Sequence, residues 1–464
     1  MIARPVSGPV VGLRGADRIL KFPGIRYGRA RRFAKPVRAE HHTGVVDATR
    51  PGPICPQLPS RLEPVFGPQW NEPPQSEDCL HLAVTTPGLT GARPVMLWVH
   101  GGGFVTGGGT LPMYDGGRLA ADGDVVVVSV NYRLGALGCL VHEGGSDGNL
   151  GLYDQVLALE WVRDNIAAFG GDPASITVFG QSAGASSVLL LMSVPRARRL
   201  IRRLIAQSAP TLTTLPTLGD ALAARRRFAE AAGGDLATLP VDRILKVQAD
   251  MARWNADMTP GSGSDTGTGT GTDTDTDTDT DTDTDTDTDT VPLLPALAAP
   301  LVHRTPIRRV FRSGPVPDLV IGYTSDEGAA FTVGAPTPVP EDDVAAMSRE
   351  LFVEPAHEIA REALGLGGAA FLYEFGWAPS GGRPRRGARN RAALPAGHTG
   401  GVGDESAAGR HRLDDRRFPR QGTPHELGPL RVARVSEQHG GPVASMGRRG
   451  KVRAADRPAI RYGG

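Results

Sequence analysis

Ser182 has the residue type and the sequence setting of a nucleophile. It is the central residue of Gly180-Gln181-Ser182-Ala183-Gly184, which lies between two apolar runs, Ile176–Phe179 and Ala185–Val194. The first run predicts a strand and the second a buried helix. A serine on such a sharp strand-to-helix turn projects its hydroxyl oxygen, and the glycines leave room for the neighbouring strand and helix. The pattern therefore predicts covalent catalysis by Ser182, with a Gly-Ser loop of no function as the alternative.

A second glycine-rich segment directly follows another apolar run. His100-Gly101-Gly102-Gly103-Phe104 comes after Pro94–Val99, and glycines in that place free backbone N–H groups to point at one spot. We expect the N–H groups of Gly102, Gly103 and Ala183 to form an oxyanion hole, with a plain flexible loop as the alternative. His100 itself is predicted to be structural, because the catalytic histidine comes last in chains with this serine turn.

The elements that must position these residues alternate between strand and helix. Pro94–His100 and Val125–Val130 are short apolar runs that suit strands buried on both faces. From Leu152 to Phe169 the apolar residues recur every three or four positions, which predicts a helix. Asp318–Gly322 and Phe371–Trp377 are further strand-like runs. This order predicts an α/β protein with a mostly parallel, doubly wound sheet.

Taken together, the motifs resemble those of the type-B carboxylesterases, the cholinesterase-like branch of the α/β-hydrolases. The resemblance is almost continuous over residues 1–210 and returns weakly over 316–377. It implies an α/β-hydrolase fold and hydrolysis of small-molecule carboxylic esters through an acyl-enzyme, without a metal or an organic cofactor. The segments that carry it are Lys21–Tyr27 (KFPGIRY), Gly52–Gln57 (GPICPQ), Ser76–Leu80 (SEDCL), His100–Phe104 (HGGGF), Asn131–Gly135 (NYRLG), Gly148–Gln155 (GNLGLYDQ) and Trp161–Gly184.

The same resemblance suggests roles for a glutamate and two cysteines. The family usually takes the acid of its catalytic triad from a D-E-G segment, which here is Asp326-Glu327-Gly328. This implies Glu327, with Asp326 as the rival and an ordinary loop carboxylate as the alternative. Cys55 and Cys79 occupy the positions of a family disulfide, and a bridge and two free thiols both remain open. Cys139 is predicted to be a small buried apolar residue.

The histidine that this chemistry needs is missing from its expected place. The family has a segment like G-x-x-H-x-x-E-L-P-F after the acid, and no such segment follows Glu327. His357 lies in a predicted polar helix and is expected to be a surface residue. His398 is nearest in sequence to the lost motif and is the candidate base by default, against a solvated loop histidine as the alternative. The other candidates are His411, His425 and His439.

A shifted reading frame accounts for this loss. From 381 to 464 the chain has 17 Arg and one Lys against 7 acidic residues, a net charge of +11, and few large apolar residues. If the frame of Gly382–Pro395 (GRPRRGARNRAALP) slides forward by one base, codons can be chosen that read AALGAGHATELPFL. The histidine then comes from Ala388 and the first base of Arg389. We hypothesise that residues from about 381 onward are the product of a frameshift.

Composition divides the chain into four regions. Residues 1–260 and 291–380 read as the two parts of an α/β-hydrolase core. Residues 261–290 are a Thr-Asp repeat with nine Asp from Asp273 to Asp289 and no Lys or Arg, which predicts a disordered acidic insertion. A calcium site in this repeat is disfavoured, because calcium loops need a fixed ligand order. Residues 381–464 are predicted to be a disordered basic tail.

The overall numbers exclude several classes of protein. Hydrophobic residues make up 40% of the 464, the net charge is +1 and there are 3 cysteines, so collagen, coiled-coil and disulfide-scaffold proteins are excluded. No apolar stretch approaches the ~18 residues of a membrane span. Met1–Arg14 has no continuous apolar stretch, so we expect a cytoplasmic protein, with secretion left open.

Two other functions remain as alternatives. A catalytically dead binding protein on the same fold is disfavoured, because such members usually lose the serine that is present here. Nucleic-acid binding through the basic tail is not expected, because the tail has only Phe418 and Tyr462 as aromatic residues and no zinc or helix-turn-helix pattern.

Overall fold

The computed structural model describes residues 1–15, 18–60, 62–63, 73–210, 216–257, 310–312, 314–332, 338–376 and 430–434. The predicted acidic insertion at 261–290 lies outside these ranges, as does the predicted tail from 381 except for 430–434. None of the described helices is long and apolar enough to cross a membrane.

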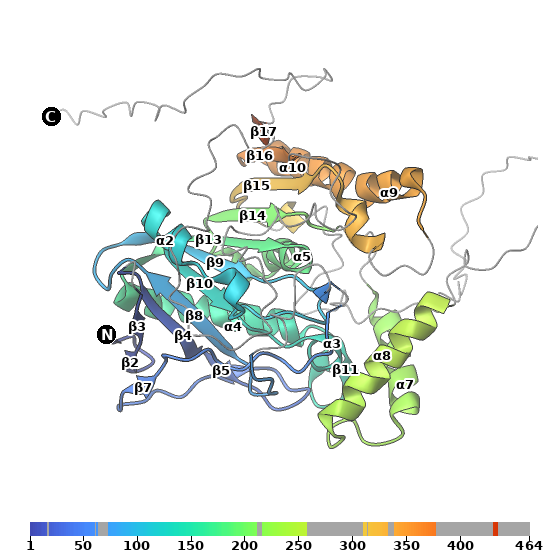
Figure 1. The fold of residues 1–464 in the computed structure, drawn as a ribbon, viewed down its shortest axis with the longest axis horizontal. Helices are drawn as coiled ribbons and strands as arrows, with labels where there is room; N and C mark the ends of the chain where they lie inside the picture. Colours follow the sequence, from blue (N-terminus) through green and yellow to red (C-terminus); the bar gives the residue numbers. More distant parts are fainter. Residues whose placement is uncertain are drawn as a thin grey trace, which may run out of the picture.

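A mixed sheet of ten strands forms the centre of the described structure (Figure 1). Its order is β17-β16-β15-β14-β13-β9-β10-β8-β4-β3. Neighbours from β16 to β10 run parallel, and antiparallel strands flank them on both sides. The strands are β3 (Leu13–Arg14), β4 (Leu20–Arg26), β8 (His81–Thr86), β9 (Arg93–Val99), β10 (Val126–Val130), β13 (Gly171–Gln181), β14 (Arg203–Gln207), β15 (Asp318–Thr324), β16 (Ala370–Phe375) and β17 (Leu430–Arg434). The mostly parallel sheet predicted from the sequence is confirmed.

Helices connect the parallel strands as the apolar spacing predicts. The long helix α4 covers Leu150–Asn165, continues as a 3₁₀ turn over Ile166–Phe169 and ends at Gly170, whose φ of 76° suits a glycine. The others are α2 (Gly117–Gly123), α3 (Gly135–Cys139), α5 (Ala183–Leu190), α6 (Pro195–Arg198), α7 (Leu218–Ala232), α8 (Val241–Asp257), α9 (Glu341–Ser348) and α10 (Glu354–Gly365). Figure 1 shows α7 and α8 as a neighbouring pair that stands apart from the sheet.

Short strands and single turns complete the described structure. The small strands are β1 (Ile2–Ala3), β2 (Val10–Val11), β5 (Gly28–Arg29), β6 (Val37–Arg38), β7 (Val46–Asp47), β11 (Val141–His142) and β12 (Ser146–Asp147). The 3₁₀ turns besides the one after α4 include Pro112–Tyr114, Leu191–Ser193 and Glu327–Thr332, and Arg349–Val353 is a π-helical turn.

Apolar side chains pack on both faces of the sheet. The larger core includes Val95, Leu97 and Val178 and extends to α4, α5 and α10. A smaller cluster lies on the other face, where Trp98 of β9 and Phe179 of β13 pack with Tyr114 of the turn Pro112–Tyr114. The Trp98 ring is 4.9 Å from the ring of Phe179 and 5.1 Å from that of Tyr114. Burial on both faces is what a parallel sheet requires, and it explains the continuous apolar runs in the sequence.

One buried arginine holds the described segment that precedes β15. The Arg198 guanidinium donates hydrogen bonds to the carbonyl oxygens of Met192, Val310, Phe311, Gly314 and Pro315 at 2.7–3.2 Å. Burial lowers the pKa of Arg198. Because β15 and β16 join the same sheet as β9, β10, β13 and β14, these two strands belong to the same core as the strands of the amino-terminal part.

The strand β17 was not anticipated from the sequence. Leu430–Arg434 pairs antiparallel with β16 at the edge of the sheet, within the region predicted to be a disordered tail. An edge strand offers unpaired backbone N–H and C=O groups to any chain that can extend beside it, so pairing there needs little from the side chains.

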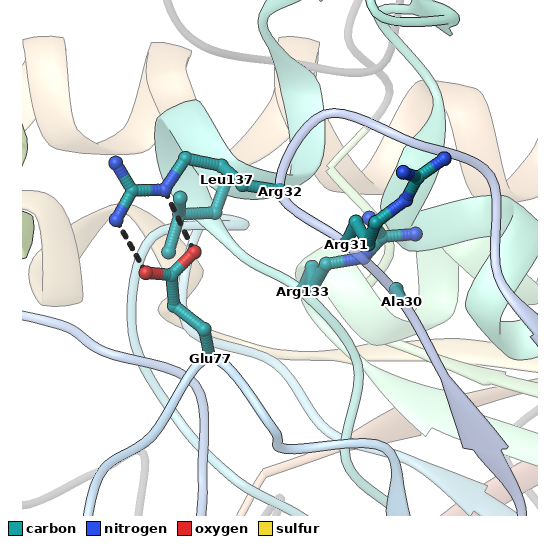
Figure 2. Close-up of a pocket in the computed structure, with 6 residues that line it drawn as sticks. All are labelled: Ala30, Arg31, Arg32, Glu77, Arg133 and Leu137. Atoms are coloured by element: carbon teal, nitrogen blue, oxygen red, sulfur yellow. Dashed lines mark hydrogen bonds and ion pairs between the residues drawn. The ribbon is translucent and has the colours of Figure 1, made fainter. Parts of the chain in front are cut away.

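Two arginine–carboxylate pairs lie close to the amino-terminal part of the chain. Figure 2 shows Arg32 facing the carboxylate of Glu77, with Arg31 and Arg133 turned to the other side. The cavity between these residues has a volume of about 10 Å³, no more than one water needs, so it is not a substrate pocket. Arg133 instead pairs with Asp154, and this second pair is almost completely buried.

Candidate active site

Ser182 occupies the strained turn that the sequence predicts. It lies between the last residue of β13 and the first of α5, with φ 56° and ψ −127°, a backbone conformation that non-glycine residues rarely adopt. The flanking glycines are needed for space. A Cβ atom at Gly184 would overlap the carbonyl oxygen of Val99, and one at Gly180 would lie 2.6 Å from the backbone of Gly184. The turn thus packs directly against the end of β9.

The loop after β9, residues 100–109, is called the oxyanion loop below. It lies beside Ser182, because a Cβ atom at Gly101 would be 3.3 Å from the Cβ of Ser182 and 2.6 Å from the carbonyl oxygen of Gln181. Gly102 and Gly103 have φ values of 112° and 62°, which glycine adopts without strain. The two half-motifs predicted from the sequence therefore meet at one place.

Hydrogen bonds fix the direction of the three candidate oxyanion donors. In a trans peptide the C=O of one residue points opposite to the N–H of the next, so holding the oxygen orients the donor. The carbonyl oxygen of Gly102 accepts from the N–H groups of Val105 and Thr106 at 3.1 and 3.0 Å, which orients the N–H of Gly103. The carbonyl oxygen of Ser182 accepts from Ser186 N–H at 3.0 Å, which orients the N–H of Ala183.

The third donor, the N–H of Gly102, is oriented by a histidine side chain. His100 Nδ1 lies 2.8 Å from the carbonyl oxygen of Gly101, so in the neutral ring this nitrogen carries the proton and donates it. Burial lowers the pKa of His100 to about 4, which keeps the ring neutral at ordinary pH. The ring also stacks on Tyr132 at 4.3 Å. These contacts agree with the structural role predicted for His100.

The ends of three neighbouring parallel strands bring the serine near a buried carboxylate. Ser182 N–H donates to Gln207 O of β14 at 3.0 Å, and Ser208 N–H donates to Gly322 O of β15 at 2.8 Å. The Ser208 hydroxyl in turn lowers the pKa of Glu327 by hydrogen bonding. Sequence reasoning missed Ser208. Its signal was its position directly after β14, the strand that pairs with β13, which ends just before Ser182.

Glu327 is the buried member of the acidic pair at the end of β15. Its side chain is 4% exposed, and Oε1 accepts a hydrogen bond from Thr324 N–H at 2.6 Å. Burial raises its pKa, while hydrogen bonds from Ser208 and Thr324 oppose that rise and the charge of Asp326 adds to it. Asp326, the rival in sequence, is only half-buried on the preceding turn. Burial and the hydrogen bonds from Thr324 and Ser208 distinguish Glu327 from Asp326 as the carboxylate held at this end of the sheet.

The histidine candidates divide into one described residue and four that are not. His357 lies on α10, where its Nε2 is 3.2 Å from the hydroxyl of Tyr323. It is half-buried, so the expectation of a surface residue is only partly met. No histidine within the described ranges hydrogen-bonds Ser182 or Glu327. His398, His411, His425 and His439 lie outside those ranges, so the prediction of His398 as base stays a prediction.

The structure contains thiols where the resemblance left a disulfide open. Cys55, Cys79 and Cys139 are all buried and free. A hydrogen bond with Cys55 is the largest cause that raises the pKa of the Cys79 thiol, and burial adds to it, so the two side chains are in contact without a bridge. Burial raises the pKa of Cys139 to about 12, in keeping with its predicted apolar role. No cluster of metal-ligating side chains occurs within the described ranges.

Ser182 lies on the turn after β13, and the buried Glu327 follows β15, two strands further along the parallel sheet. This arrangement is that of the α/β-hydrolase fold. The model of the carboxylesterase family matches residues 4–354. The chain belongs to this carboxylesterase family.

Relatives with curated names match about half of the chain or less. A probable N-octanoylanthranilate hydrolase of Rhodococcus erythropolis is 49% identical over 50% of this chain and 51% of its own length. The para-nitrobenzyl esterase of Bacillus subtilis is 47% identical over 42% of this chain and 40% of its own. The mouse cholinesterase is 44% identical over 44% and 35%. The chain thus spans about half the length of these relatives or less.

Solved structures match over a longer part of the chain. A PNB esterase superposes with a TM-score of 0.67 at 29% identity and covers 84% of this chain and 82% of its own. A carboxylesterase of Geobacillus stearothermophilus gives a TM-score of 0.65 at 30% identity, over 81% and 80%. The common fold therefore extends well beyond the segment of high sequence identity.

The Glu327→Gln variant is expected to be more stable than the parent chain above neutral pH. A folded-state pKa raised above the unfolded value means that the contribution of Glu327 to stability is fully present below the unfolded pKa and is lost as pH rises through the folded pKa. Glutamine does not titrate and can still accept from Thr324 N–H. We expect a gain on the order of 1 kcal/mol at pH 8 that disappears at pH 4.

Urea unfolding of both proteins at several pH values measures this difference. The exposed Glu350→Gln variant is the matched control and should show no such pH dependence. A Glu327→Gln variant that is less stable than the parent at pH 8 would mean that a cation compensates the buried carboxylate.

Proposed function

We propose that this protein is a serine carboxylesterase that hydrolyses small-molecule carboxylic esters through an acyl-enzyme. The observation that carries the proposal is the strained Ser182 turn beside three N–H groups whose peptide planes are each held by a hydrogen bond. A nucleophile next to preorganised donors is an arrangement suited to acyl transfer. The relatives, which include a para-nitrobenzyl esterase and a liver carboxylesterase, support the same substrate class.

The proposed reaction has two halves. In the first, Ser182 Oγ attacks the ester carbonyl carbon, and the N–H groups of Gly102, Gly103 and Ala183 hold the negative oxygen of the tetrahedral intermediate. The alcohol leaves with a proton, and an ester of Ser182 remains. In the second half, water attacks this ester and releases the acid. Each donor contributes about 10²–10³ in rate.

A base must take the proton from Ser182 and return it to the alcohol. Glu327 would orient a histidine and stabilise the imidazolium that forms. The raised pKa of Glu327 is consistent with a buried carboxylate that has no positive charge beside it among the described residues. The segment that should carry this histidine follows β16, whose last residues pair with the end of β15 just before Glu327. We therefore propose that the family's histidine segment once followed β16 and that the shifted frame removed it.

Covalent labelling tests the proposed nucleophile. A fluorophosphonate probe should modify Ser182 in the full chain, and the modified peptide should be the one that spans residues 180–184. The Ser182→Ala variant should take up no label, because no other serine of the described structure lies between a strand and a helix beside the oxyanion loop. The Ser186→Ala variant is the matched control, one turn along α5, and should label normally. Modification of another peptide, or no modification of either the parent chain or a protein with its reading frame restored near Gly381, would contradict the proposal and favour a catalytically dead binding protein.

A further inference from the structure

Gln57 holds the far end of the oxyanion loop by both backbone groups of one residue. Gly107 N–H donates to Gln57 Oε1 at 2.6 Å, and Gln57 Nε2 donates back to the carbonyl oxygen of Gly107 at 2.8 Å. The second hydrogen of Nε2 goes to the carbonyl oxygen of Cys55 at 2.9 Å. The side chain is 6% exposed, so these hydrogen bonds do not compete with bulk water.

Gly107 packs back against the start of the same loop. A Cβ atom at Gly107 would lie 2.6 Å from the carbonyl oxygen of Gly101 and 2.6 Å from His100 Nδ1. These are the two atoms of the hydrogen bond that orients the N–H of Gly102. Holding Gly107 in place therefore also holds the peptide plane that carries one oxyanion donor.

The glycine-rich oxyanion loop needs contacts such as those of Gln57 to hold one conformation. Glycine occupies positions 101, 102, 103, 107, 108 and 109, and glycine loses more conformational freedom on ordering than any other residue. Asn131 holds the loop further along, where its Oδ1 accepts from Gly109 N–H at 2.8 Å. Between the hydrogen bond of Thr106 N–H to Gly102 and that of Gly109 N–H to Asn131, both backbone groups of Gly107 are held by Gln57.

We propose that Gln57 is a positioning residue of the oxyanion hole, acting through Gly107 on the peptide between Gly101 and Gly102. This inference depends on the proposed function, because it assigns a donor to a developing oxyanion. It gives a role to the last residue of the Gly52–Gln57 motif, which the catalytic scheme leaves unexplained. Gln57 touches no substrate in this scheme and affects only the geometry of the donor.

The Gln57→Glu variant of the full chain tests the proposal. A carboxylate of nearly the same shape can accept from Gly107 N–H but cannot donate, and it places an oxygen against the carbonyl oxygens of Gly107 and Cys55. Hydrogen exchange of the peptide covering 100–111 should become faster by about tenfold or more. The maximal rate of Ser182 modification by a fluorophosphonate should fall about ten- to a hundredfold, while the concentration for half-maximal rate stays the same.

Two further variants separate positioning from stability. Asn165→Asp disrupts another buried amide side chain, which links α4 to the start of the chain. Asn165 Oδ1 accepts from Ser7 N–H, and Nδ2 donates to the carbonyl oxygen of Trp161 on α4, both at 2.8 Å. This variant should lower the melting temperature without changing exchange in 100–111 or the rate of modification. Gln75→Ala removes only the acceptor of Gln57 N–H, so it should fold and show the Gln57→Glu changes in weaker form.

Each outcome decides one claim. Exchange in 100–111 that is no faster in the Gln57 and Gln75 variants than in Asn165→Asp overturns the proposal, whatever the rate of modification. Faster exchange with an unchanged modification rate also overturns it, because the effect of Gln57 then does not reach the oxyanion hole. If neither the parent chain nor a protein with its reading frame restored near Gly381 is modified at Ser182, the proposed function fails, and the exchange experiment alone decides whether Gln57 holds the loop.

Discussion

Restoring the reading frame by one base near Gly381 is expected to raise the hydrolysis of a short-chain nitrophenyl ester by about 10²–10⁴-fold over the chain as it stands. Without a positioned base, Ser182 keeps its proton and attacks slowly. The oxyanion hole and substrate binding still leave about 10³–10⁴ over water, so the parent chain should be a weak esterase and not an inert protein.

The architecture explains why a histidine after β16 would reach the site. β13, β14, β15 and β16 are parallel neighbours, so their carboxyl ends lie along one edge of the sheet. Ser182 follows the first of these strands and Glu327 the third. A segment that leaves the end of β16 at Phe375 starts next to the Tyr323–Thr324 end of β15. In the restored frame the histidine at the position of Ala388 would follow this strand end, on the same edge of the sheet as Ser182 and Glu327.

The assay compares three proteins. The parent chain and its His398→Ala variant should have equal low rates, and the frame-restored protein should be much faster. A selective loss of activity in His398→Ala would make that histidine the base. Equal and substantial rates in the parent and the frame-restored protein would contradict the frameshift account of lost activity.

The sequence predicts those parts of the fold that local patterns determine. The all-buried strand Val126–Val130 and the helix Leu150–Asn165, with its 3₁₀ continuation to Phe169, follow from apolar runs and spacing, and each lies within two residues of its expected bounds. The turn at Ser182 follows from a motif whose two glycines are required, because a Cβ atom at either position would clash with neighbouring backbone. In all these cases the residues that carry the signal are neighbours in the chain.

Contacts between distant segments could not be read in this way. Gln57 and Gly107 are far apart in the sequence and meet only in the fold. Nothing in the residues around Gln57 indicates that its side chain binds Gly107. The same holds for Ser208 beside Glu327 and for the pairing of β17 with β16. For Cys55 and Cys79 the resemblance predicted that the two side chains lie close together, but it did not decide between a disulfide and two free thiols.

The Asp154→Asn variant is expected to lose about 3–5 kcal/mol of unfolding free energy, the largest loss of stability among our predictions. Asp154 is completely buried, and its carboxylate accepts from the backbone N–H, Nε and Nη2 of Arg133 at 2.7–3.0 Å. Arg133 is 4% exposed and also donates to the carbonyl oxygen of Ala34. Asparagine would leave a buried guanidinium without its counter-charge and turn an amide N–H₂ toward its donors.

Urea unfolding of this variant and a matched control measures the effect. Asp164→Asn breaks an ion pair with Arg38 in which the two side chains are 28% and 55% exposed, and it should cost at most about 1 kcal/mol because water screens that pair. The double variant Arg133→Met, Asp154→Leu should be more stable than Asp154→Asn, because replacing both partners leaves no unpaired buried charge. Equal losses for Asp154→Asn and Asp164→Asn would contradict the argument, because Asp154 is fully buried and accepts three hydrogen bonds from Arg133, whereas Asp164 is 28% exposed and its partners Arg38 and Arg163 are 55% and 42% exposed.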